Sequence, residues 1–336
     1  MSQDKTFVYP KIEDNIEHLR KELGIGVSFD VLLREFKIGR KKVAFVFLDS
    51  FSNGEVIIYI MQTLLSVKQE DIVPNPLEKI TAKILPYGEI TFVDNLEEAV
   101  NEVLGGPLIF LIDGEKKIII LDIRQYPGRQ PDEPDIEKIT RGSRDGFVET
   151  MLFNVALIRR RLRDPKLRVE GVTIGSRSLT DIALIYIKDI INPNILEEIR
   201  GRLLKIDVDG LPMAEKTVEE FITADFWNPF PKVRYTERPD VAAVHLLEGH
   251  VCIVVDTSPS VMIAPVTYFH HVQHAEEFRH NPIVGVYIRW VRLLGIILSV
   301  LLVPSWLLIA DYSQMLPESF QFIGPKEEFA LPLFIQ

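Results

Sequence analysis

The chain has 336 residues, enough for about two folded domains at roughly 100 to 200 residues each. Hydrophobic residues make up 47% and charged residues 26% of the sequence, yet the mean hydropathy of +0.12 is high for a wholly soluble protein. Acidic residues outnumber basic ones by 48 to 38, and this net charge of −10 argues against a nucleic-acid-binding protein. The single cysteine, Cys252, cannot form an intrachain disulfide. These features predict an intracellular folded region together with one unusually apolar segment.

Residues 1–125 have the pattern of an α/β subdomain, and no secretory signal peptide precedes it. Apolar residues at helical spacing, capped by Gly24 in the first case, predict helices over residues 11–23, 56–65 and 96–104. Apolar alternation or short apolar runs predict strands over residues 29–33, 43–48, 108–112 and 118–123. The Asp113-Gly114 pair between the last two strands is typical of a hairpin turn.

Residues 126–140 begin with a proline-rich, acidic and aperiodic stretch that predicts a linker. A second α/β subdomain is expected over residues 141–285, and no internal repeat is evident in the sequence. Its expected helices span residues 147–168, 195–204, 241–247 and 266–278. Its expected strands span residues 169–174, 182–187 and 251–255.

The apolar excess lies in residues 286–312, where residues 293–310 contain no charge. A helix of 18 residues is about 27 Å long, close to the hydrocarbon thickness of a bilayer. The flanking residues typical of a transmembrane helix are Arg289, Arg292, Trp290 and Trp306, and the two arginines predict a cytoplasmic N-terminal region. The alternative is a buried core helix kinked at Pro304. Residues 313–336 are expected to form an external loop and the start of a truncated apolar segment.

The fold class that follows is a two-subdomain cytoplasmic α/β region, then a transmembrane helix and the start of a truncated membrane domain. Within the second subdomain, residues 141–168 carry eight basic and three acidic side chains. Arginine binds phosphate and carboxylate groups bidentately, so this stretch predicts contacts with another subunit or with anionic lipid. A solvated helix face with local ion pairs is the alternative. The candidates are Arg141, Arg144, Arg159, Arg160, Arg161 and Arg163.

The segment RYTERPD, residues 234–240, packs arginines and acids around a proline. One interpretation is a clamp between the subdomains, with Arg238 held by a carboxylate. The other is a structured loop in which Glu237 or Asp240 caps the next helix. The clamp candidates are Arg234, Glu237, Arg238 and Asp240.

The histidine-rich segment at residues 270–277, HHVQHAEE, has a helical His-x₃-His spacing but not the HExxH pattern of a zinc enzyme. No third ligand is identifiable at a separate position, so no metal and no cofactor is predicted. The sequence also contains no phosphate-binding loop and no nucleophile elbow around Ser258. A non-enzymatic protein is therefore expected, with a zinc enzyme built on these histidines as a remote alternative.

Several long motifs resemble those of one known family. They are DGFVETMLFNVALIRRRLRDPKL (145–167), SRSLTDIALIYI (176–187), RYTERPD, LLEGHVCIVVDTSPSVMIAPVTYFHHVQHAEEF (246–278) and RWVRLLG at the entry to the apolar segment. In this order they resemble the A-subunit type of the spore germination receptor family, over about residues 10–312. His250 and Thr257 stand where receptor members more often carry Arg and Gly, which favours a paralogous branch.

The resemblance implies a cytoplasmic two-subdomain region and a polytopic membrane domain in the inner membrane of bacterial endospores. It implies a subunit of an oligomeric ion-releasing channel complex that amplifies germination, with a nutrient-binding germinant receptor subunit as the alternative. The implied partners are further copies of the chain, a small membrane partner protein, other germination proteins and membrane lipids, but no nucleic acid. Family members continue through several more membrane spans, so the sequence is expected to be truncated within the membrane domain.

Overall fold

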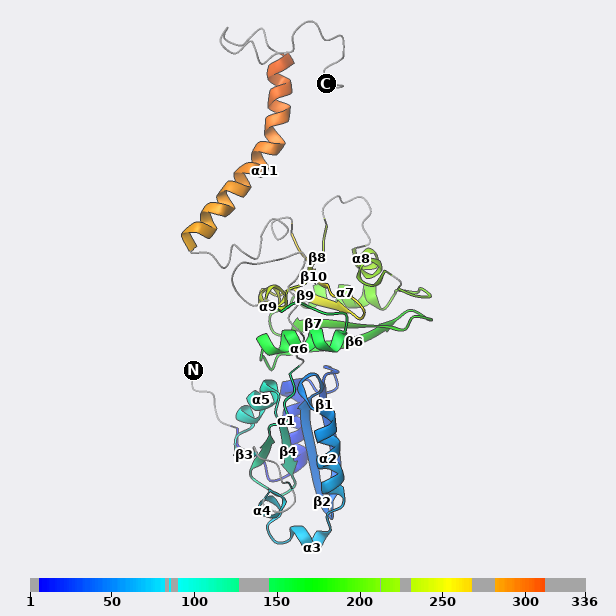
Figure 1. Cartoon of the computed structure of the whole chain (residues 1–336), viewed down its shortest axis with the longest axis vertical. Helices are drawn as coiled ribbons and strands as arrows, with labels where there is room; N and C mark the ends of the chain where they lie inside the picture. The colour runs from blue at the N-terminus through cyan, green and yellow to red at the C-terminus, as the bar shows by residue number, and fades with distance from the viewer. Residues whose placement is uncertain are drawn as a thin grey trace. The chain divides into compact units, whose positions relative to one another are not determined.

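The computed structural model describes residues 6–81, 85, 90–126, 145–211, 213–223, 231–267 and 282–311. The chain forms two compact units, one of residues 1–139 and 143–271 and the other of residues 140–142 and 272–336. The first unit contains two α/β subdomains, coloured blue to cyan and green to yellow in Figure 1. The described part of the second unit is one long helix, α11.

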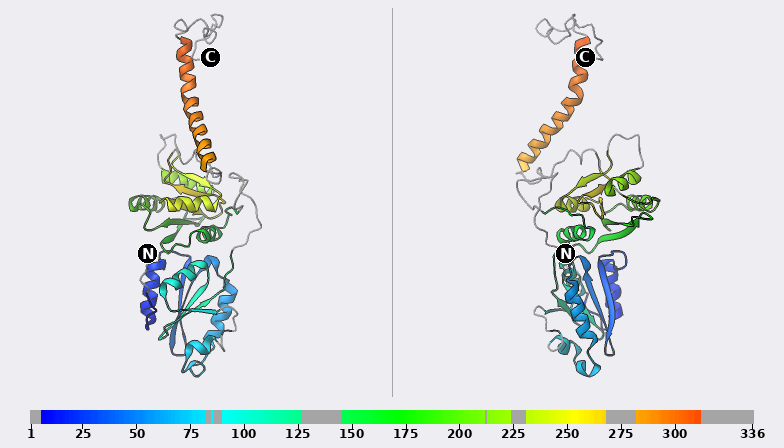
Figure 2. Two further views of the ribbon diagram at one scale, coloured as in Figure 1. Left: turned by 90° about the vertical axis from the view of Figure 1, so that its left-hand side faces the viewer. Right: turned by 45° about the vertical axis from the view of Figure 1, so that its right-hand side comes forward.

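The first subdomain is a five-stranded antiparallel sheet with strand order β1-β2-β4-β5-β3 and helices on both faces (Figures 1 and 2). Its amphipathic first helix ends at Gly24, which adopts the left-handed conformation (φ 70°) predicted for it. In chain order its elements are α1 (Ile12–Leu23), β1 (Val31–Ile38), β2 (Lys41–Leu48), η1 (Asp49–Phe51), α2 (Gly54–Leu65), α3 (Gln69–Ile72), α4 (Pro76–Lys79), β3 (Ile90–Val93), α5 (Leu96–Gly105), β4 (Leu108–Ile112) and β5 (Ile118–Leu121).

The second subdomain is another five-stranded antiparallel sheet, with order β6-β7-β9-β10-β8. Its central strand β9 is buried along its whole length, as its continuous apolar run predicts. In chain order its elements are α6 (Met151–Arg161), β6 (Leu167–Ile174), β7 (Thr180–Ile187), α7 (Pro193–Leu203), α8 (Ala214–Thr223), β8 (Arg234–Thr236), α9 (Pro239–Leu247), β9 (Val251–Val255) and β10 (Val261–Ala264).

The two subdomains have the same topology. The strand order of the second corresponds one to one with that of the first, and α1, α2 and α5 correspond to α6, α7 and α9. The second subdomain is therefore a structural repeat of the first, and we call them the first and second repeats. The expectation that the chain has no internal repeat is wrong at the level of structure, because the side chains differ while the order of the elements is the same.

Equivalent hydrogen bonds hold the start of each repeat. The buried Asn15 side chain in α1 accepts a hydrogen bond from the amide of Tyr9 and donates one to its carbonyl oxygen. The buried Asn154 in α6 makes the same two bonds with Val148, also six residues earlier. Each asparagine thus satisfies both backbone groups of the residue that leads into its helix.

The hairpins of the two repeats are equivalent as well. The side chain of Asp113 accepts from the first amide of α1 at 3.3 Å, and Asp256 accepts from the first amide of α6 at 2.9 Å. The next residue has a positive φ in both repeats, 82° at Gly114 and 71° at Thr257. Since a β-branched residue is strained in this region, Thr257 keeps a turn that glycine forms without strain.

Each sheet buries a hydrophobic core on both of its faces. In the first repeat α1 and α5 cover one face, and α2 covers the other. In the second repeat α6 and α9 cover one face, and α7 and α8 cover the other. Both repeats are therefore three-layered, and the predicted α/β class is confirmed.

Several local predictions need correction. The helix expected over residues 147–168 ends at Arg161, and β6 begins at Leu167. Strands β3, β8 and β10 are absent from the sequence predictions, because runs of three or four strand residues carry too little periodicity to be recognised. Helix α8 is absent too, although its buried residues Ala214, Val218 and Ile222 recur at helical spacing. The helix expected over residues 266–278 and the linker 126–140 lie almost wholly outside the described residues.

Helix α11 (Pro282–Asp311) has the properties of a membrane span. Its segment Ile283–Leu308 has a mean hydropathy of 2.2 over its most apolar 18 residues, none of which is buried. At about 1.5 Å per residue, these 26 residues exceed the roughly 30 Å hydrocarbon thickness. The described structure does not bury this segment, which favours a candidate membrane span over a buried core helix.

Candidate functional site

The arginine-rich stretch of the second repeat supplies most of the polar contacts between the two repeats. The guanidinium of Arg159 in α6 donates two hydrogen bonds to Asp30, from Nε to Oδ2 at 2.7 Å and from Nη2 to Oδ1 at 2.9 Å. The side chains are only 2% and 0% exposed. A bidentate pair out of reach of water is strong and directional, so it fixes α6 against the segment that leads into β1.

Arg168 in β6 completes this contact by capping α1. Its Nη2 donates to the carbonyl oxygens of Lys21 and Glu22 at 3.4 and 3.2 Å. The guanidinium lies directly over Gly24, where an added Cβ would be 2.4 Å from Nε of Arg168. A cation at a helix C-terminus interacts favourably with the helix dipole. Gly24 therefore has two roles. It ends α1, and its lack of a side chain leaves room for the Arg168 guanidinium against the helix end.

Burial and charge affect the ionisable groups at this junction. Burial lowers the pKa of Arg168, and the positive charge of Arg159 lowers it further. Lys166 donates to Glu22 at 2.9 Å and holds the pKa of that carboxyl below its usual value. Burial raises the pKa of Asp49, with a further contribution from the negative charge of Asp30. At this junction the pKa of each of these groups therefore depends on the charge of a neighbouring side chain.

Backbone hydrogen bonds join the repeats at the same place. The amide of Phe29 donates to the carbonyl oxygen of Val169 at 3.1 Å, and the amide of Val169 donates to Oγ of Ser28 at 3.2 Å. We define the inter-repeat junction as residues 22–30 together with Arg159 and residues 166–169. It links a loop of the first repeat with a helix and a strand of the second.

The other arginines of the predicted contact set lie in different environments. Arg160 is exposed, and its Cζ lies 4.8 Å from the ring centroid of Tyr126. Arg161 donates to Asp145 at 2.6 Å, whereas Arg163 is exposed. Arg141 and Arg144 lie outside the described residues. The buried Arg159 does not reach a surface in this structure, so the prediction of a subunit or lipid contact is wrong for that residue and stays a prediction for the exposed ones.

The four clamp candidates lie together around the start of α9. Arg238 is fully buried and is held by a carboxylate, donating to Asp240 from Nε at 3.1 Å and from Nη2 at 2.8 Å. Arg234 is a buried residue of β8, and the carbonyl oxygen of Glu237 accepts from the amide of Phe147 at 2.8 Å. These contacts lie within the second repeat. The buried ion pair that connects the repeats is formed by Arg159 instead.

Sequence reasoning missed Asp30, the partner of that pair. The signal was present, because Asp30 stands alone between the apolar residues Phe29 and Val31 at the start of a strand. A buried carboxylate needs a cation or several hydrogen bonds. The sequence alone does not show that the cation is 129 residues away.

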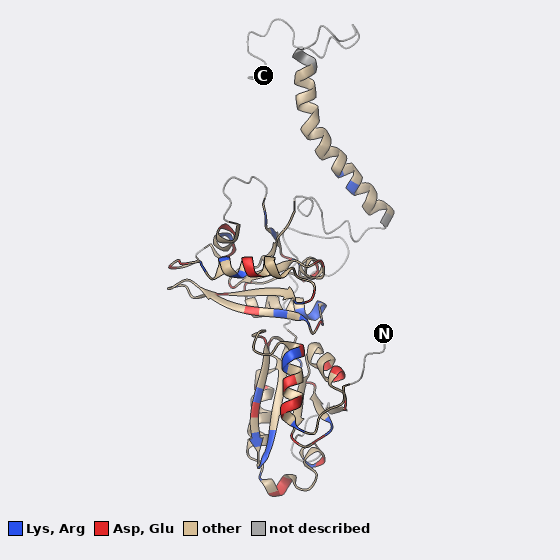
Figure 3. Ribbon diagram, turned by 180° about the vertical axis from the view of Figure 1, so that it is seen from behind, with Lys and Arg blue, Asp and Glu red and all other residues tan. Residues whose placement is uncertain are grey.

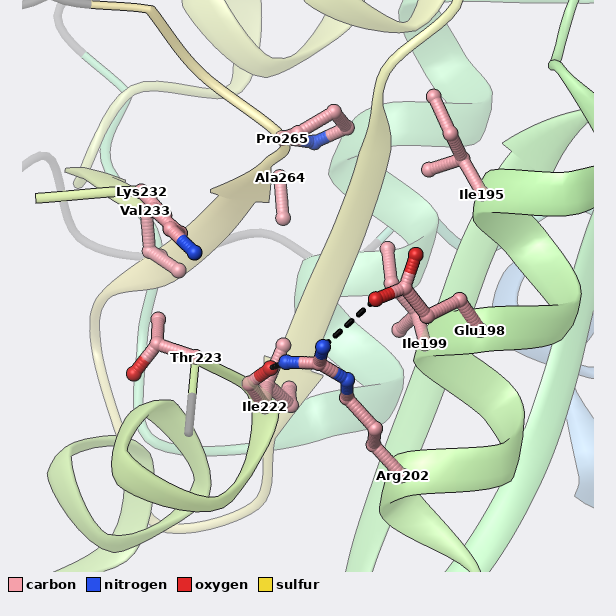
Figure 4. A pocket seen from close by; sticks show the side chains of 10 residues that line it. All are labelled: Ile195, Glu198, Ile199, Arg202, Ile222, Thr223, Lys232, Val233, Ala264 and Pro265. Carbon is pink, nitrogen blue, oxygen red and sulfur yellow. Dashed lines mark hydrogen bonds and ion pairs between the residues drawn. The ribbon is translucent and has the colours of Figure 1, made fainter. Parts of the chain in front are cut away.

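A cavity of about 230 Å³ lies within the second repeat (Figure 4). The apolar part of the wall is formed by Ile195, Ile199, Ile222 and Val233. The Arg202 side chain also lines the cavity and forms an ion pair with Glu198. Its walls come from α7, α8, the two residues before β8 and the end of β10. The cavity therefore lies wholly within the second repeat, and no residue of the first repeat lines it.

The described residues show no group of three His, Cys, Asp or Glu side chains that could hold a metal ion. The histidine-rich segment at residues 270–277 lies outside them. Buried His245 donates from Nδ1 to the carbonyl oxygen of Val241, and burial lowers its pKa. Ser258 is bonded to the backbone of Ser260. His245 in α9 and Ser258 between β9 and β10 thus bond to nearby backbone groups of the second repeat.

The membrane-flank candidates all lie on α11. Arg289 and Arg292 are in its N-terminal half, and Figure 3 shows the rest of the helix almost free of charged residues. Trp290 and Trp306 are exposed, 16 residues apart in sequence, or about 24 Å along the axis. This spacing places one tryptophan towards each end of an apolar segment, where aromatic residues meet membrane interfaces.

A duplicated α/β region followed by a long exposed apolar helix defines a class of membrane-associated protein, and comparisons with known proteins identify the family. The model of the Bacillus/Clostridium GerA spore germination protein family matches residues 17–336. The chain is 45% identical to stage V sporulation protein AF of Bacillus subtilis (strain 168), over 99% of this chain and 68% of that protein. The chain therefore belongs to this spore germination family.

Two further relatives support the assignment. Spore germination protein KA of Bacillus subtilis (strain 168) is 31% identical over 92% of this chain and 57% of its own length. The crystal structure of the N-terminal domain of the A subunit of the Bacillus megaterium spore germinant receptor GerK3 is similar with a TM-score of 0.62 and 29% identity, covering 79% of this chain and 99% of that one. The chain thus spans between about half and two thirds of the full-length relatives.

Proposed function

We propose that this chain is the N-terminal region and first membrane span of a non-enzymatic channel subunit that releases ions and amplifies spore germination. Its repeats would lie in the cytoplasm and α11 would enter the spore inner membrane. The observation that carries the proposal is α11, a 26-residue apolar segment with exposed side chains and arginines only near its start, in a chain of a germination family.

A comparison of the two repeats supports assembly into an oligomer. Helices α2 and α7 are equivalent and begin after equivalent N-caps, Asn53 and Asn192. The outer face of α2 carries two large apolar side chains, Ile58 and Tyr59, which are 58% and 59% exposed. The corresponding positions of α7 are Glu197 and Glu198, which are 68% and 61% exposed. Since charged residues suffice for the fold at these positions, we infer that the apolar face of α2 contacts another copy.

Cysteine crosslinking in membranes tests this contact. The native Cys252 is fully buried, so a single introduced cysteine would be the reactive thiol among the described residues. We expect Tyr59→Cys to give a dimer band with a short bifunctional maleimide. Glu198→Cys is the matched control, at the same position of the other repeat, and should stay monomeric. Equal crosslinking of both variants, or of neither, would contradict an interface at α2.

Fractionation and ion release test the function itself. In a strain that encodes the complete protein, we expect the protein in carbonate-washed spore inner membranes and slower ion release after its deletion. Complementation with the unaltered gene should restore the rate. Absence of the protein from that membrane, or unchanged ion release in the deletion strain, would refute the proposal.

A nutrient-binding receptor subunit is the second candidate, and the cavity of the second repeat is the observation that favours it. Thermal-shift screening with amino acids and sugars tests it. A compound that raises the midpoint of the unaltered chain but not of a variant with Ile199→Trp, which fills the cavity, would support this function. No shift with any compound would count against it.

A further inference from the structure

The cavity of the second repeat combines an apolar interior with charged side chains that reach solvent (Figure 4). The wall residues Ile199, Ile222 and Val233 are buried, whereas the side chains of Glu198 and Arg202 are 61% and 36% exposed. The charged groups therefore lie towards the opening. At about 230 Å³ the cavity is smaller than the roughly 300–1,000 Å³ of sites for drug-sized ligands, so it fits a small molecule.

Two cations and one carboxylate line this cavity. Figure 4 shows the Arg202 guanidinium between Ile222 and Glu198. Its Nη2 donates to Glu198 at 2.6 Å, and its Nη1 donates to the carbonyl oxygen of Ile222. The second cation is Lys232, whose carbonyl oxygen accepts from the amide of Val266 at 3.0 Å. The lining thus has one more positive than negative side chain, which favours a singly charged anion as the ligand.

The first repeat shows that the fold does not require these charges. Helices α2 and α7 begin after equivalent N-caps, so Arg202 corresponds to Thr63 of α2. By the same count Glu198 corresponds to Tyr59. The Thr63 hydroxyl simply donates to the carbonyl oxygen of Tyr59 within its own helix. The second repeat therefore places a cation at the cavity where the first repeat carries a neutral side chain.

We propose that this cavity binds a small aliphatic monocarboxylate, with the carboxylate at the two cations and a branched apolar body against the buried isoleucine and valine side chains. A guanidinium carries five N–H donors and an ammonium three, so both cations can donate to a ligand oxygen in addition to their bonds within the protein. The apolar body would displace water from the cavity interior, at about 0.8 kcal/mol for each buried methylene group.

The same lining disfavours an α-amino acid. Among the ten residues that line the cavity, Glu198 is the one carboxylate, and it already accepts from Arg202. A ligand ammonium group would lose water without gaining a carboxylate of its own, which costs free energy. The inference rests on the cavity named for the second candidate function but predicts a different ligand. It does not depend on the channel proposal.

Isothermal titration calorimetry with 4-methylpentanoate tests the site, using the full chain in a non-ionic detergent and the detergent alone as the blank. We expect Lys232→Gln to bind at least about tenfold more weakly, since a hydrogen bond to a charged group is worth about that factor. Lys205→Gln removes an exposed lysine outside the lining and should bind as the unaltered chain does. No binding by the unaltered chain, or equal binding by the two variants, would overturn the proposal.

A ligand series tests the two halves of the site without any substitution. The amide 4-methylpentanamide has the apolar body without the charge, and acetate has the charge without the body. Leucine adds an ammonium group to 4-methylpentanoate. We expect each of the three to bind at least about tenfold more weakly than 4-methylpentanoate.

The outcomes of this series separate the inference from the second candidate function. Equal binding of the amide would refute the role of the cations, and equal binding of acetate would refute the role of the apolar walls. Leucine binding as tightly as 4-methylpentanoate would overturn the monocarboxylate proposal and support nutrient recognition instead. Binding of 4-methylpentanoate without any response to amino acids or sugars would support the inference while the nutrient candidate fails.

Discussion

Replacing Arg159 by methionine should destabilise the two-repeat region strongly, because Asp30 would remain buried without its partner. The pair is 2% and 0% exposed and makes two hydrogen bonds at 2.7 and 2.9 Å. Removing one partner of a buried ion pair costs about 3–5 kcal/mol, chiefly because the other charge stays desolvated. Asp49 lies close enough for the charge of Asp30 to raise its pKa, so the lone carboxylate would also face a second one.

Neutralising both partners should recover much of this loss. Asp30→Asn/Arg159→Gln leaves no buried charge and loses mainly hydrogen-bond energy, so we expect a cost of about 1–2 kcal/mol. Arg159→Gln, Asp30→Asn and the double variant form a thermodynamic cycle. Each single variant should cost about 3–5 kcal/mol because it leaves one buried charge, so we expect a coupling of at least about 4 kcal/mol. Glu13→Gln is the surface control. It breaks an ion pair with Lys42 in which both side chains are more than half exposed, and solvent screening should leave the unfolding midpoint almost unchanged.

Urea unfolding of residues 1–267, followed by far-ultraviolet circular dichroism, measures these free energies. The crystal structure of the corresponding N-terminal domain of a relative supports the choice of this fragment. The m-value should stay constant across the variants, since a change would indicate loss of two-state unfolding. A loss below about 1 kcal/mol for Arg159→Met, or additive effects of the two single variants, would refute the argument that this pair fixes the repeats together.

Three other predictions use single sites. Thr257→Gly should raise the free energy of unfolding by up to about 1 kcal/mol by relieving a positive φ, while Gly114→Thr at the equivalent turn should lower it by about 1–2 kcal/mol. Chemical denaturation of both variants measures these changes, and equal effects would contradict the equivalence of the turns. Burial lowers the pKa of His245, so the unfolded chain takes up a proton more readily, and stability should fall as the pH drops below about 6.5. His245→Gln should flatten this part of the stability profile. An unchanged profile would mean that other groups cause the loss of stability. Burial raises the pKa of the Cys252 thiol, so maleimide should label it only after denaturation, as mass spectrometry would show; rapid labelling of the folded chain would contradict the burial.

Much of the local structure could be predicted because it depends on neighbouring residues. The helix ending at Gly24, the hairpin at Asp113-Gly114 and the buried strand around Cys252 each have a periodic or turn signal within a few residues. The apolar helix α11 is the clearest case, since length and hydropathy alone mark it as a candidate membrane span. The motifs that resemble the germination family are contiguous in the sequence, so they can be recognised without the fold.

The tertiary structure decided what depends on residues far apart in sequence. It alone revealed the repeat, because the chain preserves the order of strands and a few backbone-binding side chains such as Asn15 and Asn154 but little else. It also reassigned Arg159 from a surface contact to a buried pair with Asp30. A run of arginines in a sequence carries the same charge whether it faces water or a carboxylate, and only folding brings that carboxylate into contact and determines which of the charges remain outside.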